Sequence, residues 1–153
     1  MVTRILQAAG ARGWTITTAE SCTGGMVASA LTDVSGASEV FQRGFVTYSN
    51  DAKTDMLGVR PETLNTFGAV SEPVVREMAE GARETARADI AVAISGIAGP
   101  GGTATKPEGR VCYGLATPDG TRTMAIDHGA LGRDAVRRAA TENALEMILS
   151  ALA

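Results

Sequence analysis

Apolar side chains follow two different periods along the chain, and together they predict alternating helices and strands. Apolar residues at helical spacing predict helices over 2–9, 23–34, 52–57, 71–82 and 136–152, with a further short helical piece from Pro61. β-Branched or continuous apolar runs predict strands over 14–18, 40–48, 89–95, 111–117 and 121–127. Ser49 and Ser71 stand where two of the helices begin, and each can cap the first turn with its hydroxyl oxygen.

The order of these elements predicts the fold class. Helices alternate with strands until the last two strands, which the turn Pro118-Asp119-Gly120 joins into a hairpin. The apolar run 90–94 is typical of a central strand that is covered on both faces. We therefore expect an α/β fold, a three-layer α/β/α sandwich with a mixed β-sheet. Because no repeat or linker divides the chain, we expect a single domain over 1–153.

Composition narrows the classes of partner. Of the 153 residues, 44% are hydrophobic and 20% are charged, which is typical of a soluble globular domain. The net charge is −3 and no basic cluster exceeds Arg137-Arg138, which argues against nucleic acid as a partner. No signal peptide and no long apolar span is visible, so we expect a cytoplasmic protein without a membrane partner. Cys22 and Cys112 lack metal-ligand spacing and there is one histidine, so we expect no metal and no cofactor.

The segment 19–25 (Ala-Glu-Ser-Cys-Thr-Gly-Gly) is the first candidate active centre. It leads from a predicted strand through small residues and two glycines into a predicted helix. Such a turn presents a side chain at a sharp bend and leaves N–H groups of the helix N-terminus free to hold negative charge. We therefore expect Ser21 to act as a nucleophile, and Thr23, Gly24 and Gly25 to contact the substrate.

A serine nucleophile needs a base that accepts its proton, and the chain has few side chains that can act as one. Lys53 and Lys106 are the only lysines among 14 basic residues, and arginine does not give up its proton. A lysine whose pKa is lowered by burial can take the proton of a serine hydroxyl. Lys53 lies on a short helix after a strand whereas Lys106 lies in a long loop, so Lys53 is the expected base. A Ser-His-Asp triad through the single histidine, His128, stays open at this point.

Cys22 is a rival nucleophile, because a thiol at a helix N-terminus has a lowered pKa. Alternation of side chains beyond the strand would put Ser21 and Thr23 on one side and Cys22 on the other. Only one of the two adjacent nucleophiles is therefore expected to face the pocket, and in the alternative interpretation Cys22 packs behind Ser21.

A second candidate is the glycine-rich stretch 95–102 (Ser-Gly-Ile-Ala-Gly-Pro-Gly-Gly), which leaves the predicted central strand. Loops of this kind let backbone N–H groups reach a phosphate or an oxyanion, and open α/β sheets bind ligands at the carboxyl ends of their strands. The stretch matches neither a Walker loop nor a dinucleotide fingerprint, so an inert surface loop is the alternative. The further substrate-binding residues that we expect are Tyr48, Ser71, Ser95, Gly96, Gly99, Gly101 and Gly102.

Four blocks of sequence, in this order, closely resemble the CinA C-terminal domain family: Ala-Glu-Ser-Cys-Thr-Gly-Gly, Gly-Phe-Val-Thr-Tyr-Ser-Asn-Asp-Ala-Lys, Gly-Ala-Val-Ser-Glu and Ala-Ile-Ser-Gly-Ile-Ala-Gly-Pro-Gly-Gly. They span Thr17 to Gly114. The resemblance implies a metal-independent nicotinamide-nucleotide amidohydrolase, in a stand-alone form without the larger N-terminal domain of some members. Ser21 matches the position that we assign as nucleophile, and Lys53 matches the family's lysine. The resemblance also implies a homodimer or a higher homo-oligomer.

The activity implied by this resemblance is the hydrolysis of nicotinamide mononucleotide to nicotinate mononucleotide and ammonia. Two alternatives remain beside it. A catalytically silent module would bind the nucleotide in the same pocket without releasing ammonia. A cysteine-dependent hydrolase would use Cys22 in place of Ser21.

Overall fold

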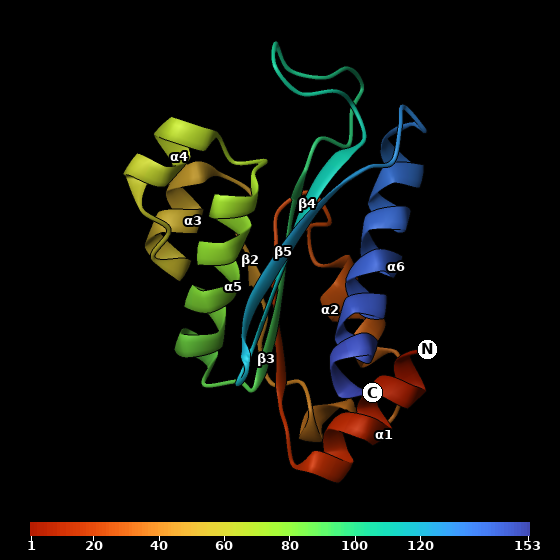
Figure 1. The fold of residues 1–153 in the computed structure, drawn as a ribbon. Coiled ribbons are helices and arrows are strands. Elements are labelled where there is room, and N and C mark those ends of the chain that lie inside the picture. The colour runs from red at the N-terminus through yellow and green to blue at the C-terminus, as the bar shows by residue number, and fades with distance from the viewer.

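Five strands form one mixed sheet in the computed structural model, which describes residues 1–153 (Figure 1). The strands are β1 (Ile16–Glu20), β2 (Phe45–Val46), β3 (Ile90–Gly96), β4 (Arg110–Thr117) and β5 (Gly120–Asp127), and their order across the sheet is β2-β1-β3-β4-β5. β2, β1 and β3 run parallel, β4 runs antiparallel to β3, and β5 runs antiparallel to β4. The carboxyl ends of β1, β2, β3 and β5 therefore lie at the same edge of the sheet.

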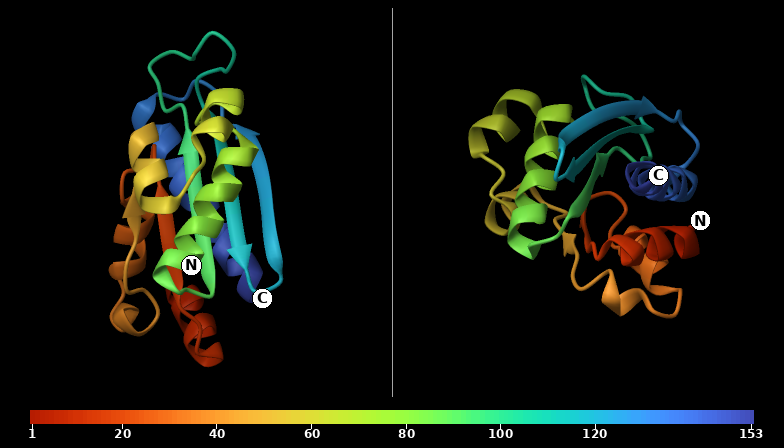
Figure 2. Two further views of the ribbon diagram at one scale, coloured as in Figure 1. Left: turned by 90° about the vertical axis from the view of Figure 1, so that its left-hand side faces the viewer. Right: turned by 60° about the horizontal axis from the view of Figure 1, so that its bottom comes forward.

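Helices cover both faces of this sheet. They are α1 (Val2–Arg12), α2 (Met26–Thr32), α3 (Asn50–Leu57), α4 (Pro61–Phe67), α5 (Glu72–Ala86) and α6 (Arg133–Leu152), with a 3₁₀ turn at Ala37–Glu39. Figures 1 and 2 show α3, α4 and α5 on one face and α1, α2 and α6 on the other. The predicted three-layer α/β/α sandwich with a mixed sheet is confirmed. None of the helices combines the length and the hydropathy that a membrane span requires.

β3 shows how one strand serves two hydrophobic cores. Ile90, Val92 and Ile94 pack in the cluster beneath α1, α2 and α6, whereas Ala91 and Ala93 pack in the cluster beneath α5. Successive side chains of a strand point to opposite faces, so a run without polar residues is buried on both sides. The small alanines on the second face leave room for α5 to lie close to the strand.

Gly81 lets α5 touch α3, the helix that carries Lys53. A Cβ atom built at Gly81 lies 1.9 Å from the carbonyl oxygen of Leu57, the last residue of α3. Gly81→Ala is therefore expected to lower the free energy of unfolding by about 1–3 kcal/mol, because a backbone contact relaxes poorly. Chemical denaturation measures this change.

Gly10 in α1 provides the matched control, since no atom lies within 4 Å of a Cβ built there. Gly10→Ala is expected to raise the free energy of unfolding by roughly 0.5–1 kcal/mol, the ordinary gain of alanine in a helix. A Gly81→Ala variant as stable as Gly10→Ala would contradict the close packing of α5 on α3.

The predicted strand 40–48 is wrong over most of its length. β2 comprises only Phe45–Val46, and Phe41 makes a single bridge to Ile16. Between them the hydroxyl of Thr17 donates to the carbonyl of Arg43 (2.8 Å), so a side chain takes the place of a backbone ladder bond. This short edge strand leads directly into the segment that carries Lys53.

The predicted helix over 23–34 also begins later than expected, at Met26. Gly24 and Gly25 adopt φ values of 56° and 106°, in the left-handed region that an α-helix does not use. The segment 21–25 is therefore a turn and not the first turn of a helix.

Candidate active site

Ser21 and Lys53 meet at the carboxyl edge of the sheet. Ser21 directly follows β1, and its N–H group donates to the carbonyl of Ile94 (2.9 Å). Lys53 lies in the first turns of α3, which Ser49 caps as predicted by accepting the N–H of Ala52 (3.0 Å). The Nζ atom of Lys53 lies 3.0 Å from the Oγ atom of Ser21. Two residues that are far apart in the sequence, and that the sequence analysis selects as nucleophile and base, thus lie at hydrogen-bond distance.

The environment of Lys53 makes its neutral form accessible near neutral pH. The side chain is 1% exposed, and Nζ donates to the carbonyl of Thr47 (2.8 Å) without contacting any carboxylate. Burial lowers the pKa of Lys53 to about 8. About a tenth of the molecules would then carry a neutral amine at pH 7. Such an amine can keep its bond to Thr47 and accept the proton of the Ser21 hydroxyl.

A cavity of about 360 Å³ opens beside this pair. Ser21 is 8% exposed and lines it together with Lys53. The predicted substrate-binding residues that also line it are Tyr48, Ser95, Gly96, Gly99 and Gly101. The structure therefore brings the ends of β1 and β3 and the segment after β2 around one space.

Thr23, Gly24 and Gly25 do not line this cavity. The expectation that Ser21 and Thr23 share a side is wrong, because the strand ends at Glu20 and its alternation ends with it. Thr23 is fully buried, and its hydroxyl donates to Glu20 Oε1 (2.6 Å). Ser21 and its neighbour Cys22 both line the cavity instead.

The start of α2 is not free to bind an external anion, which corrects a second expectation. The carboxylate of Glu20 accepts the N–H of Val27 (2.9 Å) and the N–H of Ala28 (3.0 Å). Arg137 donates to the carbonyls of Cys22 (3.0 Å) and Thr23 (3.4 Å) from the other side of the turn. The anion that the helix N-terminus attracts is thus a side chain of the same protein.

Ser71 and Gly102 also lie outside the cavity lining. Ser71 caps α5 as predicted, since its Oγ atom accepts the N–H of Val74 (3.4 Å) and donates to the carbonyl of Gly68 (2.7 Å). Gly102 packs against the loop backbone, and a Cβ atom there would lie 2.4 Å from the carbonyl oxygen of Lys106. A contact of Ser71 or Gly102 with substrate stays a prediction.

Neither Cys22 nor His128 is suited to replace the Ser21–Lys53 pair. Burial raises the pKa of the Cys22 thiol to about 11, which disfavours the thiolate that a cysteine nucleophile requires. His128 lies outside the cavity lining, and its Nε2 atom is 2.6 Å from the hydroxyl of Tyr113. The raised pKa of the Cys22 thiol and the position of His128 therefore favour serine and lysine over a cysteine nucleophile or a histidine triad.

Arg133 lines the cavity and was not among the predicted site residues. It is the first residue of α6, and it donates to the carbonyl of Gly99 (2.8 Å) and to the hydroxyl of Tyr48 (2.7 Å). The feature that could have predicted the position of Arg133 is the direction of β5. Because β5 runs parallel to β3, the residues after β5 return to the edge where Ser21 lies.

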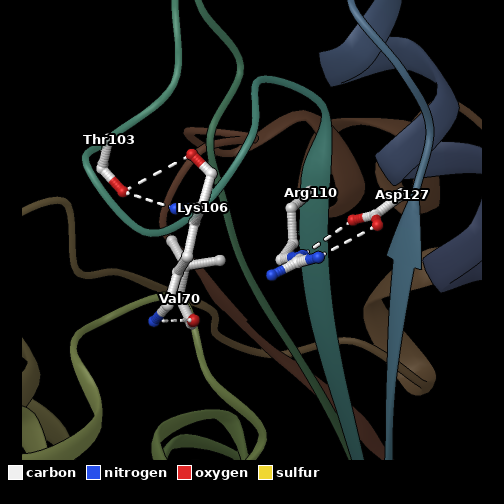
Figure 3. A network of polar contacts seen from close by, with 5 residues as sticks. All are labelled: Val70, Thr103, Lys106, Arg110 and Asp127. Atoms are coloured by element: carbon white, nitrogen blue, oxygen red, sulfur yellow. Dashed lines mark hydrogen bonds and ion pairs between the residues drawn. The ribbon is translucent and has the colours of Figure 1, made fainter.

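The glycine-rich loop between β3 and β4 is tied down at several points, and it rises above the sheet edge in Figure 1. Figure 3 shows Lys106 of this loop reaching the carbonyl of Val70. The same Nζ atom donates to the carbonyl of Phe67 (2.7 Å), which leaves it bound to the α4–α5 connection and away from Ser21. At the base of the loop Arg110 pairs with Asp127 (2.7 Å), which joins β4 to β5.

Backbone donors are available in the same space. The N–H groups of Cys22, Ala98 and Gly99 have no oxygen acceptor within the chain, and all three residues line the cavity. No group of three or more His, Cys, Asp and Glu side chains is arranged to hold a metal ion. The site thus offers a buried hydroxyl, an amine with a lowered pKa, one guanidinium and unpaired amides.

Comparison with known proteins gives the family. The model of the CinA C-terminal domain matches residues 1–152. The nicotinamide-nucleotide amidohydrolase PncC of Escherichia coli K12 is 59% identical over 143 residues, covering 93% of this chain and 87% of the relative. A putative competence-damage inducible protein of Symbiobacterium thermophilum is 54% identical over 149 residues, and the chain covers 34% of that longer protein.

Solved structures agree with this result. The competence/damage inducible protein CihA of Agrobacterium tumefaciens has a TM-score of 0.94 and 50% identity, over 99% of this chain and 92% of that one. A CinA superfamily protein of Klebsiella pneumoniae has a TM-score of 0.94 and 40% identity. The prediction that the chain is an amidohydrolase is confirmed at the level of enzyme class by its relatives. The chain belongs to the CinA C-terminal domain family.

Proposed function

We propose that this protein hydrolyses the carboxamide of nicotinamide mononucleotide, with Ser21 as the nucleophile and Lys53 as the general base. The observation that carries the proposal is the 3.0 Å contact between Ser21 Oγ and the buried Lys53 Nζ in a cavity. The substrate class is supported by the relatives that are named nicotinamide-nucleotide amidohydrolase and are 53–59% identical to this chain.

Acylation begins when neutral Lys53 takes the hydroxyl proton of Ser21. Ser21 Oγ then attacks the carboxamide carbon and forms a tetrahedral intermediate. Lys53 returns the proton to the amide nitrogen, the C–N bond breaks, and ammonia leaves. Water, deprotonated by Lys53, attacks the acyl ester, and its cleavage releases nicotinate mononucleotide and restores the Ser21 hydroxyl.

The oxyanion of the tetrahedral intermediate needs donors on the side opposite Lys53. The N–H groups of Cys22, Ala98 and Gly99, which lack an oxygen acceptor within the chain, are among the donors that the cavity residues offer. Preorganised amides stabilise developing charge well because they need no reorganisation when it appears. We assign the oxyanion to this group, which contains the residue after the nucleophile.

The 5′-phosphate requires positive charge, and we assign it to Arg133. Arg133 is the one arginine among the cavity residues, and Lys53 is largely engaged with Ser21 and Thr47. Guanidinium groups bind phosphate through paired, charge-assisted hydrogen bonds. This assignment replaces the start of α2, where Glu20 already takes the N–H groups.

Replacing Arg133 with methionine is expected to raise the KM for nicotinamide mononucleotide about 10–100-fold and to change kcat little. A charge-assisted hydrogen bond contributes roughly 1.5–3 kcal/mol, and the phosphate is bound equally before and during the reaction. Steady-state ammonia release measures both constants. The KM for the riboside, which lacks the phosphate, should stay within about twofold of wild type.

Tyr48→Phe is the control, because it removes only the hydroxyl that accepts from Arg133 (2.7 Å). It is expected to raise the KM only a few-fold, about the effect of one ordinary hydrogen bond. Equal losses for nucleotide and riboside in Arg133→Met would contradict the phosphate assignment.

The proposed reaction itself is tested by incubating the pure protein with nicotinamide mononucleotide, the riboside and free nicotinamide. Ammonia release with nicotinate mononucleotide as the matching product supports the proposal. Binding of the nucleotide by calorimetry with no ammonia would instead identify a silent binding module. The homo-oligomer that the family resemblance implies and the expected cytoplasmic location stay predictions, and sedimentation of the pure protein tests the first.

A further inference from the structure

Glu20 is the only fully buried carboxylate in the chain, and no cation pairs with it. Its side chain is 0% exposed, and it directly precedes Ser21. Oε1 accepts from the Thr23 hydroxyl (2.6 Å) and from the N–H of Val27 (2.9 Å), and Oε2 accepts from the N–H of Ala28 (3.0 Å). A buried charge is costly unless it is fully hydrogen-bonded, so these three donors are what keeps Glu20 in this position.

The hydrogen bonds of the carboxylate close a ring in the chain. They join the end of β1 to the first turn of α2, and the closed segment contains Ser21 and the two glycines with positive φ. A turn with two glycines has many alternative conformations, so a cross-link of this kind narrows the positions open to Ser21.

The backbone carbonyl of Glu20 is linked through Thr47 to Lys53, the residue that contacts Ser21. Its carbonyl accepts the N–H of Thr47 (2.9 Å), and the carbonyl of Thr47 accepts from Lys53 Nζ (2.8 Å). One residue thus connects to both sides of the pair, by its carboxylate to the Ser21 turn and by its carbonyl to the group that holds Lys53.

We propose that Glu20 is a positioning residue, whose carboxylate serves as a built-in anion at the start of α2 and holds Ser21 Oγ within hydrogen-bond reach of Lys53 Nζ. This inference rests on the proposed function of Ser21 and Lys53. It goes beyond it by assigning the alignment of the pair to a residue that touches neither the substrate nor the reacting atoms.

Glu20→Gln is the central variant, because glutamine keeps the shape and loses the charge. The NH₂ group of glutamine is a donor, and it stands where an oxygen of the carboxylate accepts a hydrogen bond. At least one of the three hydrogen bonds is therefore lost, because two donors face each other there. We expect kcat to fall about 10–100-fold, the effect of a misplacement of roughly 1 Å between reacting groups. The Kd for nicotinamide mononucleotide should stay within about threefold, because the cavity lining does not include Glu20.

A second readout needs no substrate. The rate at which a fluorophosphonate labels Ser21 reports the reactivity of the hydroxyl, and it is expected to fall by about the same factor as kcat. Labelling also separates two kinds of failure. If the wild type is labelled at Ser21 but releases no ammonia, the proposed function fails, and the labelling rates still decide the role of Glu20.

Asp89→Asn is the matched control at the far end of β1. The carboxylate of Asp89 accepts the N–H of Thr15 (2.9 Å), the same kind of contact made away from the cavity. It is expected to lower the free energy of unfolding by about 1 kcal/mol and to leave the labelling rate unchanged. Equal slowing in Asp89→Asn and Glu20→Gln would show a general loss of stability and overturn the proposal.

Thr23 supplies a milder test if Glu20→Gln does not fold. Thr23→Val removes one of the three donors to Glu20, and Thr23→Ser restores the hydroxyl. We expect labelling to slow several-fold in Thr23→Val and to recover most of the loss in Thr23→Ser. Wild-type labelling rates in both Glu20→Gln and Thr23→Val would overturn the assignment of Glu20.

Discussion

Ser21→Ala is expected to reduce the kcat for ammonia release by about 10⁴-fold or more, the largest effect of any substitution in this protein. Removal of the nucleophile from a serine hydrolase leaves only the rate supplied by binding and by the oxyanion donors. The Oγ atom of Ser21 is the hydroxyl that lies 3.0 Å from Lys53 Nζ, so no neighbouring group takes over its role. Ammonia release by pure protein, with binding followed by calorimetry, measures the loss of rate separately from affinity.

Cys22→Ala is the control for this prediction, because the thiol is adjacent and also lines the cavity. Burial raises the pKa of Cys22 to about 11, so the thiol stays protonated at neutral pH and is not an effective nucleophile. Turnover should persist in Cys22→Ala. Activity that survives in Ser21→Ala and disappears in Cys22→Ala would reverse the assignment of the nucleophile.

Lys53→Met is expected to lower kcat by about 10²–10⁴-fold, the range that a positioned general base contributes. Methionine fills a similar volume, so the buried space next to Thr47 is kept while the amine is lost. Lys53→Arg is the sharper variant, since arginine keeps the positive charge and the donors but cannot take a proton. Both should be slow, and an active Lys53→Arg would show that Lys53 acts only as a charge.

The contact between Ser21 and Lys53 was predictable from the sequence because lysine is scarce in this chain. Only two lysines are present, and Lys53 lies on a short helix after a strand whereas Lys106 lies in a long loop. The fold class was predictable for a similar reason, since buried strands and amphipathic helices alternate in a regular order.

The substrate-binding residues were less predictable, because their positions depend on tertiary contacts that the pattern of residues in the sequence does not show. Thr23, Gly24 and Gly25 resembled an anion site, but the anion at this turn is the carboxylate of Glu20, which reaches Val27 and Ala28. Glycine-rich turns before a helix carry the same sequence pattern whether they bind a ligand or a side chain of their own.

Arg133 was missed because its place depends on the direction of a strand. The hairpin predicted at 111–127 has two antiparallel strands, and the second of them, β5, returns the chain to the edge where Ser21 lies. The arginine at the start of α6 then meets Tyr48 and Gly99, which are far away in sequence. The order and direction of the strands determine that Arg133 lies at this edge of the sheet, and the local sequence around Arg133 does not.

The pH dependence of kcat/KM between pH 7 and 10 decides whether neutral Lys53 is the general base for Ser21. Neutral Lys53 is the active form, so the rate should rise with pH through the lowered pKa of about 8 and then level off. This window lies above the phosphate pKa of roughly 6, so the substrate does not titrate within it. A profile that is flat across the window, as expected for His128 with its lowered pKa, or one still rising at pH 10, as expected for the Cys22 thiol, would contradict the Ser21–Lys53 mechanism.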